Sequence, residues 1–258
     1  MLRFLFYQAI WIFAVAWGYP PEAVSLEAID GHYEAGKTRT DFLKSESELL
    51  ESLQQSPASV ALSWRLARTY LALGKFAEGD AKKDYYKRCI RQCQRAIRIN
   101  PRSAMAFFLK GVCRGKLGEL EGIWSSLGII KPFKKDMMTA IRLDPSVDHG
   151  GPHRALGRMY FELPALFGGS LGKSIQHLKE AVRLDPGYGE NYFFLAETYY
   201  EDSQYSQARS TLLKLLEVTG ESPGNPDVQE IRQKARVLLD KIQPWLKSQE
   251  SHAQRTED

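Results

Sequence analysis

The 258-residue sequence predicts an all-α fold, an α-solenoid of about four helix pairs with long inter-helix insertions and a C-terminal capping helix. Three similar segments recur, "RAIRINP" at 95–101, "TAIRLDP" at 139–145 and "EAVRLDP" at 180–186. Each segment ends an amphipathic helix, because a proline pushes the residue before it out of the helical region. A second candidate helix lies upstream of each segment, so the repeating unit is a helix pair.

The composition is that of a globular chain, with 43% hydrophobic and 26% charged residues. The formal net charge is only +4, and basic residues alternate with acidic ones, so a nucleic-acid-binding surface is not indicated. No cysteine has a nearby histidine in a nucleophile pattern, and the carboxylates are scattered on predicted solvent faces. We therefore expect a protein that is not an enzyme and that carries no cofactor.

The N-terminal segment has the pattern of an export signal. Arg3 precedes an apolar run, Phe4 to Ala16, which is interrupted only by Gln8. The run is too short for a membrane-spanning helix of about 20 residues, and it ends in small residues followed by glycine and proline. We predict a signal peptide over 1–16 and an exported, periplasmic protein without a lipidation cysteine. Retention of the segment as an amphipathic anchor stays open.

The rest of the chain divides into four parts. Asn225 and Pro226 mark the start of the last helix, as an N-cap residue and a first-turn proline. We expect a helical N-terminal lead over 17–57, a repeat domain over 58–222, a capping helix over 223–246 and a flexible tail over 247–258.

The last unit, 190–220, shows the repeat pattern without interruption. Small residues at Ala196 and Ala208 let two helices cross closely, while Tyr199 and the leucines fill the seam between pairs. This spacing resembles the tetratricopeptide repeat. The matching positions of all units form the predicted repeat core: Ala67, Tyr70, Ala96, Gly111, Ala140, Gly157, Tyr160, Ala181, Ala196, Tyr199 and Ala208.

The insertions between the halves of two units are apolar where turns are usually polar. They carry large side chains that cannot all face water without a role. Two interpretations remain open: the insertions close the repeat stack as a satellite core, or they form a binding rim. The predicted binding surface combines this rim with the concave side of the first helices: Trp124, Ile129, Ile130, Leu166, Phe167, Arg68, Arg114 and Arg158.

Two families resemble the chain over roughly residues 40–220. The long helix pairs, the export signal, an "LFGG" turn and "KSIQHLKEAVRLDPGYGENYFFLAETYY" resemble the T component associated with tripartite ATP-independent periplasmic (TRAP) transporters. They are also similar to the repeat domain of regulators of microtubule dynamics. The T-component resemblance implies a scaffold that pairs with a solute-binding component and holds a small hydrophobic ligand, and it is compatible with a homo-oligomer. The alternative is a general periplasmic adaptor for envelope protein assembly.

Two apparent sites fail on spacing. "GGSLGKS" at 168–174 resembles a phosphate loop, but Phe167 stands where the first glycine is needed, and no strand precedes it. We expect no nucleotide, and we interpret Ser170 as a helix cap. His149 and His153 are four residues apart, but glycines and a proline between them prevent one helical face from carrying both, so we expect no metal.

The chain has three cysteines, Cys89, Cys93 and Cys113. An odd number suggests one disulfide and one free thiol in an exported protein. Cys89 and Cys93 are four apart on a predicted helix, a spacing that rarely allows a disulfide. We favour the interpretation of all three as small buried apolar residues.

Overall fold

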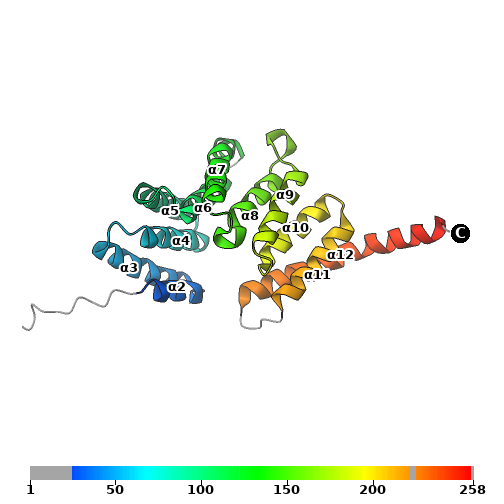
Figure 1. Cartoon of the computed structure of the whole chain (residues 1–258), viewed down its shortest axis with the longest axis horizontal. Coiled ribbons are helices and arrows are strands. Elements are labelled where there is room, and N and C mark those ends of the chain that lie inside the picture. Colours follow the sequence, from blue (N-terminus) through cyan, green and yellow to red (C-terminus); the bar gives the residue numbers. More distant parts are fainter. Residues whose placement is uncertain (1–24, 122, 221–224, 257–258) are drawn as a thin grey trace, which may run out of the picture.

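The computed structural model describes residues 25–121, 123–220 and 225–256, and all the regular elements within them are helices (Figure 1). Their bounds are α2 Leu26–Ala35, α3 Arg39–Gln55, α4 Val60–Phe76, α5 Gly79–Ile99, α6 Ala104–Glu121, α7 Ile123–Leu143, α8 Val147–Glu162, the 3₁₀ helix η1 Ala165–Phe167, α9 Leu171–Leu184, α10 Gly189–Glu201, α11 Tyr205–Thr219 and α12 Pro226–Thr256.

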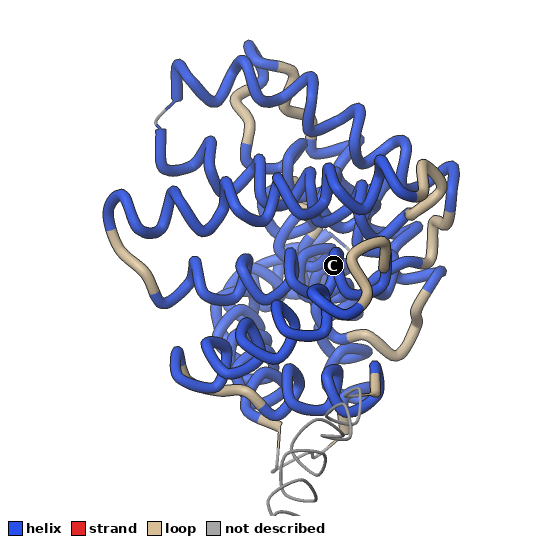
Figure 2. Tube along the Cα trace, turned by 90° about the vertical axis from the view of Figure 1, so that its left-hand side faces the viewer, coloured by secondary structure: helices blue, strands red, loops and turns tan. Residues whose placement is uncertain are grey.

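The helices form a solenoid of antiparallel pairs, as the tube in Figure 2 shows. Four pairs, α4/α5, α6/α7, α8/α9 and α10/α11, follow one another along the stack. The first helix of each pair also contacts the first helix of the next pair. Helices α2 and α3 cover one end, and α12 covers the other. The predicted all-α solenoid is therefore confirmed.

Small residues set the close approach within each pair. A Cβ atom added at Gly157 on α8 would lie 2.5 Å from Leu178 Cγ on α9. The alanines of the predicted repeat core are all fully buried, and Tyr70, Tyr160 and Tyr199 are 5–6% exposed. These tyrosines therefore fill the seams between helices, and they do not present their rings to the concave side.

The extra residues of the first two units lengthen helices and do not form loops. In the second unit α6 ends at Glu121 and α7 begins at Ile123, so residues 123–130 belong to α7. The long insertion expected between the helices of this unit is therefore present as additional turns of helix. Glutamate, leucine and isoleucine at helical spacing favour continuation of an amphipathic helix.

The third unit does carry a turn between its helices. Within η1 and the residues after it, Gly168 N donates to Ala165 O at 3.0 Å, and Ser170 N donates to Tyr160 O at 2.8 Å. The Ser170 side chain caps α9 by accepting from Lys173 N. The predicted cap is confirmed, and the "GGSLGKS" segment is a turn and a helix start.

Residues 168–172 of the same turn match the sequence motif G-x-S-x-G, which is typical of a nucleophile elbow. A catalytic elbow exposes its serine on a sharp turn from a strand into a helix. Here α8 and η1 precede Ser170, and its hydroxyl oxygen accepts the hydrogen bond that caps α9. The motif therefore lacks the turn from a strand into a helix in which a nucleophilic serine is found.

Helix α12 closes the last unit. Asn225 Oδ1 accepts from Asp227 N and Val228 N at 3.1 and 3.2 Å, and Ala235, Leu238 and Ile242 are buried against the last pair. The helix continues to Thr256, past the expected end at residue 246, and its end extends away from the stack (Figure 1). Residues 247–256 contain neither glycine nor proline, so nothing in them stops a helix.

The cysteines do not all remain free. Cys89 on α5 is bonded to Cys113 on α6, with Cα atoms 6.4 Å apart, while Cys93 is a free thiol. Burial raises the pKa of the Cys93 thiol, so it stays protonated. All three cysteines are buried, as expected, but two of them form a disulfide, because the packing of α5 on α6 brings distant positions together.

None of the helices in the described part of the chain is both long and apolar enough to span a membrane.

Candidate ligand- and partner-binding site

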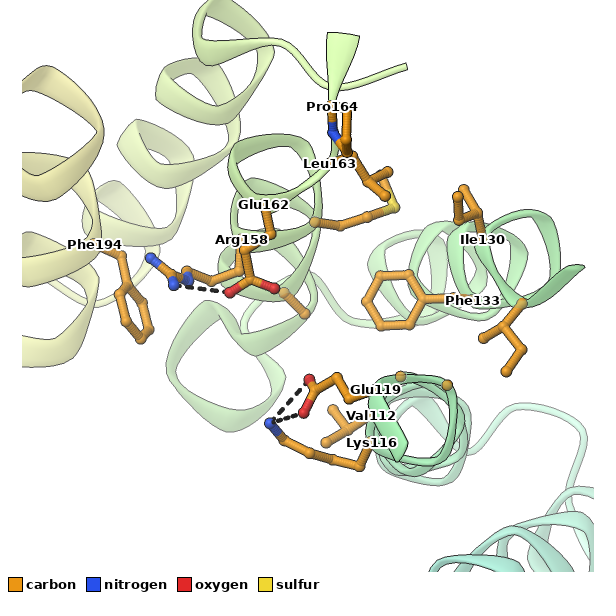
Figure 3. A pocket seen from close by; sticks show the side chains of 15 residues that line it. Val112, Lys116, Glu119, Ile130, Phe133, Arg158, Glu162, Leu163, Pro164 and Phe194 are labelled. Carbon is orange, nitrogen blue, oxygen red and sulfur yellow. Dashed lines mark hydrogen bonds and ion pairs between the residues drawn. The ribbon is translucent and has the colours of Figure 1, made fainter. Parts of the chain in front are cut away.

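A cavity of about 510 Å³ opens between α6, α7 and α8 (Figure 3). We call it the apolar cavity, because most of its lining is hydrophobic. Helix α6 contributes glycine backbone to the wall, and a Cβ at Gly115 would lie 3.4 Å from the Phe133 ring. Its apolar lining consists of Val112, Gly115, Gly118, Ile129, Ile130, Phe133, Ala155, Met159, Leu163, Pro164 and Phe194.

Charged side chains at this cavity are neutralised in pairs. Lys116 Nζ donates to both carboxylate oxygens of Glu119 at 3.0 and 2.9 Å. Arg158 donates to Glu162 at 2.8 Å and to Glu197, and its guanidinium lies 4.4 Å from the Phe194 ring centroid. Because these charges already have partners, the cavity favours an uncharged apolar group.

The predicted apolar rim separates into two parts. Ile129 and Ile130 line the apolar cavity, whereas Leu166 and Phe167 on η1 do not. Leu166 is 87% exposed, because η1 carries it on a turn that stands out from α8 and α9. Trp124 lies in the first turn of α7, and its side chain is outside the described residues.

The three predicted arginines occupy three different places. Arg158 lines the apolar cavity. Arg68 donates to Asp30 on α2 at 2.6 Å and lies 3.9 Å from the Tyr33 ring centroid. Arg114 is hydrogen-bonded to the buried Asp136. Each has a carboxylate partner within the chain, so none is a free cation.

Sequence reasoning missed Phe133, Met159 and Phe194 as lining residues. Each lies on a predicted amphipathic helix, but it is the rotation of three helices about their axes that decides which side chains face the same space.

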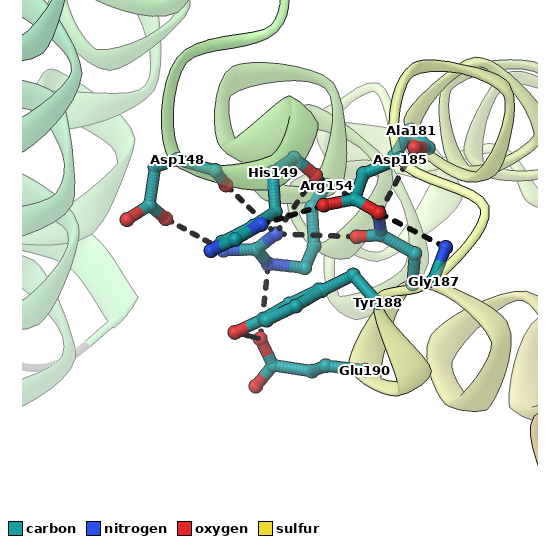
Figure 4. Close-up of polar contacts among 9 residues, drawn as sticks. Asp148, His149, Arg154, Ala181, Asp185, Gly187, Tyr188 and Glu190 are labelled. Atoms are coloured by element: carbon teal, nitrogen blue, oxygen red, sulfur yellow. Dashed lines mark hydrogen bonds and ion pairs between the residues drawn. The ribbon is translucent and has the colours of Figure 1, made fainter. Parts of the chain in front are cut away.

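A polar network fixes the start of α8 (Figure 4). Asp148, His149 and Gly150 have positive φ values of 52°, 59° and 74°. Arg154, on the next turn, is 9% exposed and donates to Asp148 O at 3.2 Å and to Asn191 Oδ1 at 3.1 Å. Such left-handed residues persist only where surrounding contacts hold them. The network therefore positions one wall of the apolar cavity.

The two histidines of this region do not converge. His149 is hydrogen-bonded to Asp185 Oδ2 at 2.6 Å and stacks on Tyr188. His153 is instead hydrogen-bonded to His177. Among the residues described, no group of three or more His, Cys, Asp or Glu side chains is placed to hold a metal ion.

Stacked helix pairs with an apolar cavity between units define a tetratricopeptide-like helical repeat protein. The chain belongs to the family of regulators of microtubule dynamics, proteins 1–3, whose model matches residues 25–243. It is 25% identical over 254 residues to regulator of microtubule dynamics protein 1 of Bos taurus, covering 91% of this chain and 77% of that protein.

Two further comparisons agree with this family and fold. The chain is 26% identical over 195 residues to regulator of microtubule dynamics protein 3 of Rattus norvegicus, covering 69% of this chain but only 41% of that protein. A thermophilic TPR protein of Thermus thermophilus superposes with a TM-score of 0.60 at 20% identity, over 77% of this chain and 92% of that one. This second likeness shows the fold alone.

The family corrects the expected location. A periplasmic protein was expected, but the matching relatives are animal proteins named for microtubules, and animal cells have no periplasm. That expectation was wrong. The resemblance to regulators of microtubule dynamics is confirmed, whereas none of these comparisons supports a transporter T component. Residues 1–16, the predicted signal peptide, lie outside the described residues.

Proposed function

We propose that this chain is a non-enzymatic scaffold that binds a partner protein and through it acts on microtubule dynamics. The names of its relatives support a role in microtubule dynamics. The tetratricopeptide-like fold supports binding of a partner protein, because stacked repeats present extended surfaces to other proteins.

The apolar cavity is the observation that carries the proposal. Its volume of about 510 Å³ lies within the range of ligand pockets, and its charged residues are already paired. Interfaces commonly depend on one or two large apolar side chains that fill such a pocket. The partner accordingly inserts an apolar anchor between α6, α7 and α8. A small hydrophobic ligand is a second candidate occupant, favoured by the same volume and lining.

Substitution of Ile130 by lysine tests the anchor site. The Ile130→Lys change places an ammonium group in the apolar cavity, which costs free energy unless the group is paired. Wild-type protein added to dynamic microtubules grown from purified tubulin, with cell extract as a source of partner, should change growth rate or catastrophe frequency. The variant should need about tenfold more protein for the same effect, equivalent to about 1.4 kcal/mol.

Leu213→Lys provides a matched control, because Leu213 on α11 is 44% exposed and does not line the cavity. It should behave as wild type. If the wild-type protein neither alters the microtubules nor co-sediments with them, the proposed function is wrong. Native mass spectrometry of the purified chain distinguishes the second candidate, since a retained hydrophobic molecule would appear as added mass that Ile130→Lys removes.

A further inference from the structure

A second cavity, of about 470 Å³, lies between α6 and α7. We call it the basic cavity; it is lined by Phe107, Lys110, Arg114, Lys131, Pro132, Lys135, Asp136 and Thr139. At about 100° of rotation per residue, its α6 residues lie on nearly the opposite face of that helix from the residues that line the apolar cavity, with Gly118 as the exception. The two cavities are therefore separate sites on the same helix pair.

Charge is unbalanced in the basic cavity. It contains four cationic side chains and one carboxylate, that of Asp136. Asp136 is 3% exposed, and it accepts from both Lys110, at 3.0 Å, and Arg114. One buried carboxylate thus holds two cations in place but neutralises only one charge. This arrangement fixes the α6 side of the cavity and leaves it positive.

The α7 side adds two further cations. Lys131 and Lys135 are one turn apart and exposed, and neither forms an ion pair among the described residues. Between residues 128 and 143, Asp136 is the only acidic residue of α7, and it is buried. The solvent-facing side of this part of α7 is consequently positive.

Apolar and hydroxyl groups complete the cavity. Lys110 Nζ lies 4.6 Å from the Phe107 ring centroid, and Thr139 Oγ1 accepts from Arg142 Nη2 at 3.0 Å. The contact with Thr139 brings a fifth cation to the edge of the cavity. A ligand here would meet several cationic donors around one aromatic ring.

We propose that the basic cavity binds an acidic segment, rich in Asp or Glu, of a partner protein. The inference rests on the proposed function in that it takes the ligand to be a protein. Several carboxylates at short spacing match several fixed cations, and charge-assisted hydrogen bonds to such groups are the strong ones. The volume is too large for a single carboxylate, and it suits a short stretch of chain.

Two other anionic macromolecules fit less well. A nucleic acid needs an extended basic stripe, whereas these cations span only a few turns of two helices in a chain of net charge +4. A membrane surface would meet exposed basic residues, whereas Lys110 and Arg114 are recessed beside the buried Asp136. An acidic peptide can enter the space between α6 and α7.

Fluorescence anisotropy of a labelled glutamate-rich peptide with the full chain tests this inference. Wild type should bind the peptide at low salt, and the affinity should fall as salt rises. The double variant Lys131→Glu/Lys135→Glu changes exposed side chains only, so it should fold normally. It should bind the peptide at least about tenfold more weakly.

Lys44→Glu/Lys87→Glu is the matched control, because both lysines are exposed, lie far from the basic cavity in sequence and give the same change in net charge. It should retain the wild-type affinity within about twofold. Equal loss in the two double variants would show a general charge effect and overturn the inference. So would binding of phosphatidylserine vesicles or duplex RNA, but not of the peptide, through Lys131 and Lys135.

Ile130→Lys separates this inference from the proposed function. It alters the apolar cavity and keeps all four cations of the basic cavity, next to which it adds a fifth positive charge, so peptide binding should not weaken. Loss of the microtubule effect with normal peptide binding would count against the proposed function alone, whereas absent peptide binding by wild type would overturn only the acidic-segment inference.

Discussion

His153 on α8 and His177 on α9 face each other, with their Nδ1 atoms 3.1 Å apart. The Tyr160 ring stacks on His177, with centroids 5.7 Å apart. Burial lowers the pKa of His177 to about 4, with further lowering by His153 and Lys134. Burial also lowers the pKa of His153, with Glu180 opposing this shift and Arg183 adding to it. Both imidazoles are therefore neutral at neutral pH, and one can donate to the other.

This pair should make stability depend on pH. Each histidine has a folded-state pKa below its ordinary value of 6.5, so below that pH the unfolded chain binds protons before the folded chain does. The stabilisation is complete above pH 6.5 and is lost as pH falls toward about 4. Urea unfolding midpoints should decline over this window in wild type, and less steeply in His177→Gln. Equal slopes for the two proteins would contradict the prediction.

The turn from α8 to α9 depends on glycine at one position. A Cβ at Gly169 would lie within 1.7 Å of Leu163 O, a backbone atom that cannot rotate away. The same turn projects Leu166 into solvent and places Leu163 and Pro164 at the apolar cavity. The need for glycine at position 169 is thus linked to the shape of the apolar cavity through this turn.

Gly169→Ala should therefore lower the free energy of unfolding by about 2 kcal/mol or more, because the backbone of the turn must move. Gly172→Ala is the control. Its added Cβ meets nothing closer than 4.0 Å, and alanine in the first turn of α9 should stabilise by up to about 1 kcal/mol. Chemical denaturation of both variants measures the difference. Two variants of equal stability would show that the turn adapts.

For the whole molecule, the open end of the repeat stack has to be covered. A repeat unit cannot bury its apolar face alone, and the last pair has no following unit. Helix α12 takes that place with Ala235, Leu238 and Ile242, which pack with Leu212 and Leu215 of α11 in one core cluster. At the other end, α2 and α3 bury Ile29, Phe42 and Leu49 with the first units.

Ile242→Ala should destabilise the chain by about 2–5 kcal/mol, because it leaves a cavity at a fully buried position. Val237→Ala, at a position 46% exposed on the same helix, should cost less than about 0.5 kcal/mol. Thermal unfolding followed by circular dichroism compares them. A small effect of Ile242→Ala would mean that α12 does not stabilise the last unit.

Much of the architecture is predictable because its signals are local in sequence. Spacings of three and four residues identify one face of a helix, and prolines and caps such as Ser170 mark its ends. Small residues at Ala67, Ala140 and Ala181 identify the closest helix contacts. The apolar insertion was identifiable by composition, although its helical conformation was not, since loops and helix extensions can share the same residues.

The sequence by itself thus determined the repeat of helix pairs, the buried small and aromatic positions and the capping helix that follows the last pair. Only the tertiary structure decided the Cys89–Cys113 bond, the separation of Ile130 from Leu166 and the basic cavity of Lys110, Arg114, Lys131 and Lys135. The physical reason is that periodicity reports which side of one helix is buried. Which side chains of two helices share a space depends on helix length, on rotation about each axis and on how the helices cross.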